Sequence, residues 1–296
     1  MSAVFPSRQL VDPLPPARHD AKEMHLTHFE PVLVSDEDLD DLASFTSFSA
    51  EECRTRLASY SLSEHAAAWK GADPRAPEAI MDFYKTTDLY IWELMQWHAS
   101  VHRFPYRAAL EDFAVRFPRA SGYTRVLDYG SGVGSDSIFL ASRGYDMTLV
   151  DVPGPTFEFA KHRFRRRKLK ASFVEATSPL PELEGPFDAA VCFDVFEHLP
   201  NPVEAARRIV RALRPDGILL EQSTFEASEA HPCHLAEGIR RFGNARWRIY
   251  LAGLGLDGEG SLMYRKPRHA RRRRLEKARF ALWRATGIWL TYVPRS

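Results

Sequence analysis

The apolar and polar positions of the chain follow two different patterns, and the first predicts an all-helical N-terminal part. Between residues 35 and 117 helix-capping signals recur, such as Ser49 followed three positions later by Glu52. The stretch 78–102 contains neither glycine nor proline and is rich in aromatic residues. It is therefore predicted to form one long helix, and a further helix is predicted over 106–117.

From residue 124 onward, short apolar runs alternate with helical segments. The apolar runs predict strands over 125–129, 147–151, 171–175, 188–193 and 217–222. The intervening segments predict helices over about 134–143, 154–168 and 202–213. Because strand–helix repetition at this spacing indicates βαβ units, the predicted fold class is α/β, a doubly wound and mostly parallel sheet with helices on both faces. After residue 225 we expect a helix near 235–252, two short strands near 256–257 and 261–266, and a basic helix over 268–284.

Composition excludes several classes of protein. The chain has 296 residues, of which 45% are hydrophobic and 27% charged, as expected for a folded globular protein. No run reaches the roughly 18 apolar residues that a membrane span needs, and the first 25 residues lack the apolar core of a signal peptide. The three cysteines are far apart and form no C-x-x-C motif, which favours a reducing, cytoplasmic location over a disulfide framework.

The formal net charge of +1 is a sum of unlike parts. Residues 1–120 carry 12 basic and 19 acidic side chains, whereas residues 261–296 carry 11 basic and 1 acidic. Charge and pattern together predict four regions: a proline-rich extended arm (1–34), a helical cap that shapes the substrate region (35–120), an α/β domain (121–266) and a basic C-terminal helix (267–296).

A glycine-rich loop follows the first predicted strand and opens the next helix. It runs from Val126 to Gly134 as V-L-D-Y-G-S-G-V-G. Glycines let a backbone turn sharply and approach a ligand closely. The spacing differs from the G-x-G-x-x-G of dinucleotide sites, and Asp128 would repel a pyrophosphate but suits an ammonium group. The loop thus favours a ligand that joins adenosine to an amino acid; the alternative is a strand–helix turn without a ligand.

At these residues the sequence resembles the class I S-adenosylmethionine-dependent methyltransferases, and the resemblance extends from about 124 to 223. It implies a seven-stranded Rossmann-like sheet and S-adenosyl-L-methionine as the cofactor. It also places the amino-acid part of the cofactor over the glycine loop. The loop residues that this assigns to the cofactor are Asp128, Gly130, Ser131, Gly132 and Gly134.

The same resemblance assigns the contacts to adenosine. Asp151 takes the position of the acid that bridges both ribose hydroxyls, a task that suits a carboxylate because it accepts two hydrogen bonds at once. Val152 would lie against the adenine. The family usually has an Asp facing the adenine amino group, and here Glu175 and Ala176 occupy that region, so Glu175 is the candidate. The remaining predicted cofactor contacts are Phe193 and Asp194.

Acidic and imidazole side chains follow the fourth and fifth strands, where an acceptor would bind. The catalytic candidates are Glu197 and His198 after the fourth strand, and His231 and His234 after the fifth. A histidine here would act as a general base, or the four side chains with Asp194 would hold a divalent metal ion. The second arrangement resembles the E-x-x-E-H of small-RNA 3′-end methyltransferases and some ubiquinone O-methyltransferases. A structural role for Glu197 and His198 weighs more than the metal, because E-H-L is widespread in metal-free members of the family.

Aromatic residues in the predicted long helix suggest a pocket. Tyr84, Tyr90, Trp97 and His98 would cover the methyl group and shape an apolar substrate pocket. The alternative is core packing of the cap on the sheet, which carries more weight for most of them because aromatic side chains supply much of a core's buried area.

Basic side chains gather in two segments, 163–170 and 271–284. They suit a peripheral membrane surface, an anionic substrate or RNA. RNA is the weakest of these, because no RNA-binding module accompanies the charges. The competing interpretation is a solvated helix face docked on the acidic N-terminal helices, and the sequence indicates no oligomeric state.

These observations predict an enzyme that transfers a methyl group from S-adenosylmethionine to a small, partly apolar molecule, with oxygen slightly ahead of carbon or nitrogen as the acceptor atom. One alternative is metal-assisted methylation of an anionic substrate, such as a prenyl diphosphate or an RNA end. Another is a cofactor-binding or peripheral membrane protein without catalysis. The sequence does not identify the acceptor.

Overall fold

The computed structural model describes residues 34–70, 75–227, 233–243, 246–260 and 262–268, with residues 278, 281 and 282. The predicted arm up to residue 33, His231 and nearly all of the predicted basic helix lie outside these ranges, so the expectations for them stay predictions. Within the described ranges, no helix combines the length and apolar character needed to cross a membrane.

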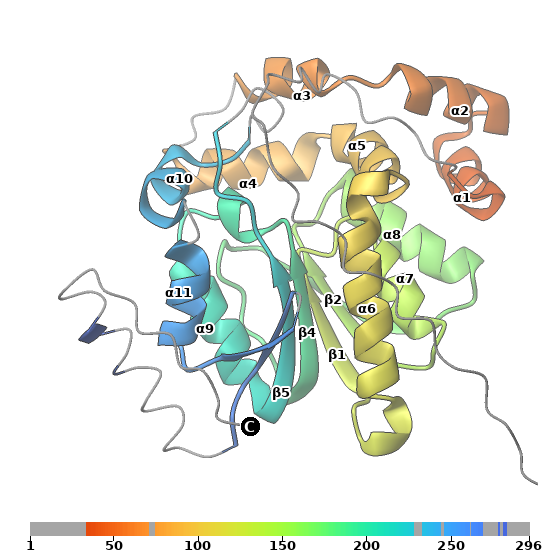
Figure 1. Cartoon of the computed structure of the whole chain (residues 1–296). Helices are drawn as coiled ribbons and strands as arrows, with labels where there is room; N and C mark the ends of the chain where they lie inside the picture. The colour runs from red at the N-terminus through yellow and green to blue at the C-terminus, as the bar shows by residue number, and fades with distance from the viewer. Residues whose placement is uncertain are drawn as a thin grey trace, which may run out of the picture.

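Seven strands form one sheet at the centre of the molecule, in the order β3-β2-β1-β4-β5-β7-β6 (Figure 1). They are β1 (Arg125–Tyr129), β2 (Asp146–Asp151), β3 (Ala171–Glu175), β4 (Phe187–Phe193), β5 (Leu213–Gln222), β6 (Asp257–Gly260) and β7 (Met263–Arg265). The first five are parallel, and β7 runs antiparallel to β5 and β6. The strand order reverses between β1 and β4, which is where sheets of this kind bind ligands. The predicted doubly wound fold class is confirmed.

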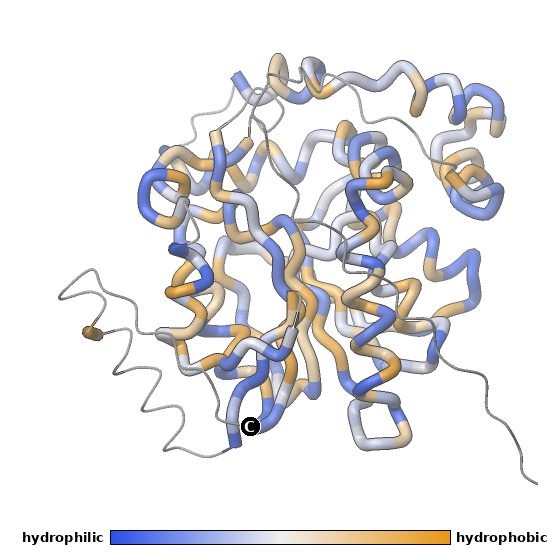
Figure 2. Tube along the Cα trace, viewed as in Figure 1, coloured by the Kyte–Doolittle hydropathy of each residue, from blue (hydrophilic) through white to orange (hydrophobic). Residues whose placement is uncertain are grey.

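Helices cover both faces of the sheet because successive strand residues point to opposite sides. In β1, Val126 packs in the cluster formed with α6, α7 and α8, whereas Leu127 packs in the cluster formed with α9, α10 and α11. These helices are α6 (Phe104–Arg116), α7 (Ser135–Ala141), α8 (Pro155–Arg166), α9 (Pro202–Ala212), α10 (Ala236–Phe242) and α11 (Arg246–Gly253). Figure 2 shows the strands between them as a largely apolar layer.

The N-terminal helices lie across one edge of the sheet, above the strands in Figure 1. They are α1 (Asp36–Thr46), α2 (Ala50–Ser59), α3 (Leu62–Trp69), α4 (Pro77–Thr86), α5 (Leu89–His98) and a 3₁₀ turn (Val101–Arg103). Ser49 and Glu52 form the predicted capping box at the start of α2. The apolar side chains of this cap pack together and also against Val133 and Phe159 of the α/β part. We use "cap" below for α1 to α5.

The predicted single helix over 78–102 is wrong, because the chain breaks between α4 and α5. Thr87 is extended (φ −85°, ψ 137°), and its hydroxyl accepts a hydrogen bond from the backbone N–H of Leu89. A threonine that bonds the backbone in this way competes with helix continuation. The break turns α5 relative to α4 and brings both helices over the same sheet edge.

Two predictions near the C-terminus also need correction. The single helix expected over 235–252 is two helices, because α10 ends at Phe242 and the following residue, Gly243, has an extended backbone (ψ 168°). The fifth strand begins at Leu213 rather than at Gly217, and Asp216 within it adopts a left-handed conformation (φ 64°). The pairing with β4 is irregular at this point, so the strand is distorted there.

The basic side chains of α8 hold the cap in place. Arg163 is almost completely buried and donates to Asp38 and Asp41 of α1, at 2.5 and 3.2 Å. Arg167 donates to the same two carboxylates at 2.6 and 2.8 Å. Helix α8 is thus docked on the acidic N-terminal helices, as predicted. The contact is made by its arginine side chains, whereas the predicted arrangement leaves the charged face in solvent. Arg165 nearby is exposed.

Candidate functional site

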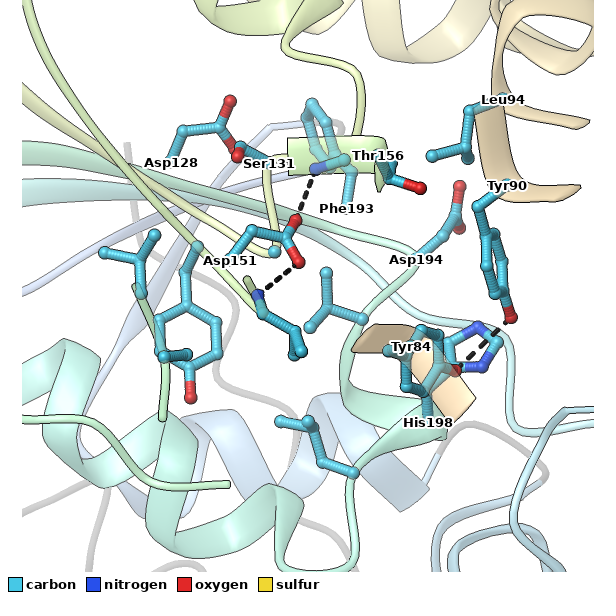
Figure 3. Close-up of a pocket in the computed structure, with 18 of the residues that line it drawn as sticks. Tyr84, Tyr90, Leu94, Asp128, Ser131, Asp151, Thr156, Phe193, Asp194 and His198 are labelled. Carbon is cyan, nitrogen blue, oxygen red and sulfur yellow. Dashed lines mark hydrogen bonds between the residues drawn. The ribbon is translucent and has the colours of Figure 1, made fainter. Parts of the chain in front are cut away.

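A cavity lies beyond the carboxyl ends of the parallel strands, between the sheet edge and helices α4 and α5 (Figure 3). The loops after β1, β2 and β4 supply its inner wall, and the cap supplies its roof. The sequence thus places the glycine loop, the acid after β2 and the acid after β4 on one surface, because parallel strands end at the same edge.

The glycine loop reaches the cavity in a conformation that side chains would obstruct. Gly130 and Gly132 both have positive φ angles, of 74° and 53°. A Cβ atom on Gly132 would lie 2.6 Å from Cδ1 of Leu94, and one on Gly130 would lie 2.5 Å from Cγ2 of Val195. Gly134 differs, because its missing Cβ would face Ala160 of α8 at 3.3 Å. Gly134 does not line the cavity, so its evident role is helix packing.

Asp151 ends β2 with its carboxylate held toward the cavity (Figure 3). Its Oδ2 accepts a hydrogen bond from the N–H of Gly132 at 2.5 Å, and its Oδ1 accepts one from the N–H of Val152 at 2.7 Å. Burial raises the pKa of Asp151 to about 6, although these two hydrogen bonds act in the opposite direction. A carboxylate oxygen can accept a second hydrogen bond, so both oxygens remain able to meet a pair of hydroxyl groups.

Asp128 lies deeper in the same wall. Its Oδ2 accepts a 2.6 Å hydrogen bond from the hydroxyl of Ser137. Burial, reinforced by the nearby Asp136 carboxylate, raises the pKa of Asp128 to about 7. A cation placed beside these carboxylates would favour their ionised forms, which suits an ammonium or sulfonium ligand.

An arginine from the cap side completes this wall. Arg103 is buried and pairs with Asp136 and, at 3.4 Å, with Asp194. Asp194 also accepts a 2.8 Å hydrogen bond from the hydroxyl of Tyr106, and one from Trp97. The carboxylate of Asp194 is therefore engaged by three donors, and it is not a member of the metal-binding group predicted with it.

Several buried polar atoms at the cavity match a ligand with many polar groups. Ser131 Oγ, Thr156 Oγ1 and Arg103 Nε line it without a hydrogen-bond partner in the described part of the chain. Buried polar atoms in folded proteins are normally paired, so these three are suited to a ligand. With the glycine loop and Asp151, they fit the polar groups of S-adenosylmethionine.

The predicted adenine contact at Glu175 does not lie in the cavity. The Glu175 carboxylate points to α8, where it accepts a 2.8 Å hydrogen bond from Lys161. The following residue, Ala176, lines the cavity instead, with Val152 and Phe193. Side chains alternate along a strand, so the acid and its neighbour take opposite directions. The structure brings the other predicted cofactor residues together, apart from Gly134.

Of the catalytic candidates within the described residues, one lines the cavity and the other two lie beside it. His198 lines it, and Glu197 beside it is buried and accepts a 2.7 Å hydrogen bond from the N–H of Thr224. Burial, together with the Asp194 charge, raises the pKa of Glu197 to about 8. His234 stacks edge-on with His198, with ring centroids 4.9 Å apart.

The four predicted pocket residues of the cap all line the cavity. Tyr84 and Tyr90 stack with ring centroids 5.1 Å apart, and the Tyr90 hydroxyl donates to that of Tyr84 at 3.3 Å (Figure 3). Trp97 packs edge-on against Tyr106. These rings therefore line the cavity and also pack in the core of the cap.

Sequence reasoning missed the cavity residues Leu94, Arg103, Asp136 and Thr156, which no motif contains. It also missed Tyr106, which donates a hydrogen bond to Asp194. Asp136 and Thr156 lie in the first turns of α7 and α8, directly after the predicted loops, so their positions offered a signal. Arg103 and Tyr106 offered none, because their partners are about 90 residues away.

Comparison with known proteins matches this part of the chain. A family of methyltransferase domains matches residues 127–220. The chain is 30% identical over 164 residues to glycine N-methyltransferase of Rattus norvegicus, covering 49% of this chain and 54% of the relative. It is 22% identical over 122 residues to a ubiquinone biosynthesis O-methyltransferase of Rickettsia akari (strain Hartford), covering 41% and 49%.

A solved S-adenosylmethionine-dependent methyltransferase from Clostridium acetobutylicum shares 16% identity and a TM-score of 0.35, covering 38% of this chain and 49% of that one. The chain thus spans about half the length of the relatives it matches. The match coincides with the glycine loop and the strands that carry Asp128, Asp151 and Asp194. Residues 127–220 of the chain are thus similar to the methyltransferase domains of this family.

Proposed function

We propose that the protein transfers a methyl group from S-adenosylmethionine to a hydroxyl group of a small, partly apolar molecule. The observation that carries this proposal is the position of Asp151. Its carboxylate, fixed by two backbone N–H groups, opens into the same cavity as the glycine loop and the apolar roof of the cap.

The residues of the inner wall suit the cofactor group by group. Asp151 would accept hydrogen bonds from the ribose hydroxyls, and Val152 and Ala176 would border the adenine. The glycine loop and Asp128 would lie beside the amino-acid part. When bound, the cofactor supplies an electrophilic methyl group on a sulfonium ion, and the chain aligns the acceptor with that methyl and excludes water.

The charge of the cavity supports a neutral acceptor. Among the described residues, the aspartates Asp128, Asp136, Asp151 and Asp194 line it, and Arg103 supplies the one guanidinium group. A cofactor that carries both a sulfonium and an ammonium group is attracted by this excess of acids. A diphosphate or an RNA end would be repelled, because like charges brought together in a poorly hydrated site cost several kcal/mol. We therefore favour a neutral molecule over the anionic alternative.

The outer part of the cavity supports a partly apolar acceptor. The cap supplies Ile80, Met81 and Leu94, and the segment after β4 supplies Leu199 and Pro200. Such walls with a few polar groups are typical of small-molecule sites. The name of the Rickettsia relative, an O-methyltransferase, supports oxygen as the acceptor atom, although the rat relative is named for transfer to nitrogen.

Binding of the demethylated product, S-adenosylhomocysteine, tests the cofactor site by titration calorimetry. Asp151→Asn replaces one acceptor oxygen by an NH₂ group, and a hydrogen bond to a charged group contributes about 1.5–3 kcal/mol. The variant should bind roughly 10–100-fold more weakly. Asp146→Asn at the other end of β2, with an exposed side chain, is the matched control and should bind like the wild type. Equal affinities for all three proteins would overturn the assignment of Asp151.

Turnover separates an enzyme from a non-catalytic cofactor-binding protein. The full chain is incubated with cofactor labelled on the methyl group and a small-molecule extract, and products are followed by mass spectrometry. We expect the label to appear in an ether of a neutral, low-molecular-weight compound. Tight binding of the cofactor without any transfer would favour the non-catalytic alternative.

A further inference from the structure

Three potential metal ligands meet at the outer edge of the cavity. Atoms of Glu197, His198 and His234 that could bind a metal ion all lie within 4.8 Å of one another. Glu197 and His198 form a 3₁₀ turn (Phe196–His198) after β4, and His234 directly precedes the N-terminus of α10. His198 also lines the cavity, so a metal ion held here would be accessible to the acceptor.

One nitrogen of each imidazole lies beside a backbone carbonyl oxygen. Nδ1 of His198 lies 3.2 Å from the carbonyl oxygen of Cys233, and Nδ1 of His234 lies 2.9 Å from that of Glu226. A carbonyl oxygen accepts hydrogen bonds only, so each Nδ1 carries the proton and each Nε2 carries the lone pair. A backbone carbonyl bound to the outer nitrogen is a common second partner of metal-binding histidines.

Glu197 supplies an independent observation. Its side chain is 1% exposed, and its Oε1 accepts the hydrogen bond from Thr224. Its Oε2 is buried and has no hydrogen-bond partner in the part of the chain that the structure describes. A buried carboxylate oxygen without a partner is costly, and coordination of a cation would remove that cost.

We propose that Glu197, His198 and His234 bind one divalent transition-metal ion with a coordination position open to the cavity. Two imidazoles and one carboxylate suit Zn²⁺, Fe²⁺ or Co²⁺ better than Mg²⁺. In a tetrahedral site with bonds of about 2.0–2.1 Å, ligand atoms lie about 3.3 Å apart. No pair of these ligand atoms would therefore have to approach by more than about 1.5 Å on binding, which small rotations of the partly exposed histidine side chains can supply.

The role of this site rests on the proposed methyl transfer. A metal ion beside the cavity would bind a hydroxyl oxygen of the acceptor and lower the pKa of that hydroxyl, whose proton leaves to water. The oxygen then forms the new O–CH₃ bond as the C–S bond of the cofactor breaks, and the bonding electron pair stays on sulfur. His198 would accordingly hold the metal and not act as the base.

The test measures metal binding on the full chain, without any assay of turnover. Chelator-treated protein is dialysed against Zn²⁺, bound zinc is counted by mass spectrometry, and Co²⁺ is followed by its visible absorption. The variants are His234→Gln and Glu197→Gln, and the latter keeps an oxygen for Thr224. His162→Gln is the matched control, because His162 lies on α8 and contacts Ser44.

We expect one Zn²⁺ per wild-type chain, with affinity lowered at least about 100-fold in both variants and unchanged in the control. Failure of the wild type to bind, or equal binding by wild type and variants, would overturn the site. Calorimetry with S-adenosylhomocysteine on the same samples keeps the two proposals apart. If S-adenosylhomocysteine binds but zinc does not, the metal proposal is overturned and the methyltransferase proposal stands. If zinc binds but S-adenosylhomocysteine does not, the metal site stands and the methyltransferase proposal is overturned.

Discussion

Replacement of Arg163 by methionine tests whether the cap is held by buried charge. The Arg163 side chain is 2% exposed and donates four hydrogen bonds. Two reach Asp38 and Asp41 of α1, and two reach the Val133 carbonyl and the Ser135 hydroxyl beside the glycine loop. Methionine fills a similar volume but leaves these acceptors without their donor.

The expected loss of stability follows from the acceptor groups that the substitution leaves without a donor. Removing one partner of a buried ion pair destabilises a protein by about 3–5 kcal/mol. Asp41 keeps Arg167, and Asp38 is partly exposed, so the Val133 carbonyl loses most. We therefore expect a loss near the lower end, about 3 kcal/mol. At roughly 2–4 °C per kcal/mol, that corresponds to a fall in Tm of roughly 6–12 °C.

Circular dichroism during urea and thermal unfolding measures this loss. Arg165→Met is the matched control, since Arg165 lies two residues away on α8 and is exposed. The control should change stability by less than about 0.5 kcal/mol. A double-mutant cycle with Asp41→Asn then isolates the pair, and a coupling energy above about 0.5 kcal/mol is expected for residues in contact. If Arg163→Met cost no more than Arg165→Met, the charges would not hold the cap.

Two further predictions follow from the structure. One concerns the contact between the cap and the loop after β2, and the other concerns the pKa of a buried acid. Gly154→Ala would place a Cβ atom 2.8 Å from the backbone oxygen of Lys85 and should cost about 1–3 kcal/mol in a urea melt, whereas Gly258→Ala meets nothing within 4 Å and should be nearly neutral. Burial raises the pKa of Glu221 from 4.5 to about 7. Its contribution to stability is therefore fully present below pH 4.5 and lost as the pH rises toward 7. Glu221→Gln, which keeps an acceptor for Trp247, should gain up to about 3 kcal/mol relative to wild type between these pH values, and a pH-independent difference between the urea midpoints would contradict this.

The α/β part could be predicted closely because its signals are local. The runs 125–129 and 171–175 became β1 and β3 with the expected bounds. In β1 the residues from 126 to 129 are all buried, as expected for a central parallel strand with both faces covered. The break at Thr87 was missed because threonine and aspartate are tolerated inside helices, and the hydrogen bond to Leu89 that ends α4 is visible only in the structure.

The candidate site was predictable at the strand ends and at four ring-bearing residues of the cap, Tyr84, Tyr90, Trp97 and His98. Asp128, Asp151 and Asp194 reach the cavity because parallel strands share an edge, and their roles toward a ligand stay predictions. Glu175 shows the limit of this reasoning, because a one-residue difference along a strand decides whether a side chain faces the cavity or, as here, Lys161. Contacts between distant segments, such as that between Arg103 and Asp194, depend on tertiary packing that no local pattern encodes.

The cap contacts the loops after β1 and β2, and these contacts link the shape of the cavity to the docked cap. A Cβ atom on Gly132 would collide with the side chain of Leu94. A Cβ atom on Gly154, after β2, would likewise collide with the backbone of Tyr84 and Lys85. Arg163 joins α1 to the carbonyl of Val133 in the same loop. Each contact meets a loop that borders the cavity, and Val133 itself is fully buried in the cluster formed with the cap. A ligand that fixes these loops would therefore also favour the docked cap, because binding stabilises whichever state it binds more tightly. The boundary at residue 120 thus marks a change of sequence pattern only. Residues before and after this boundary together form the wall of the cavity.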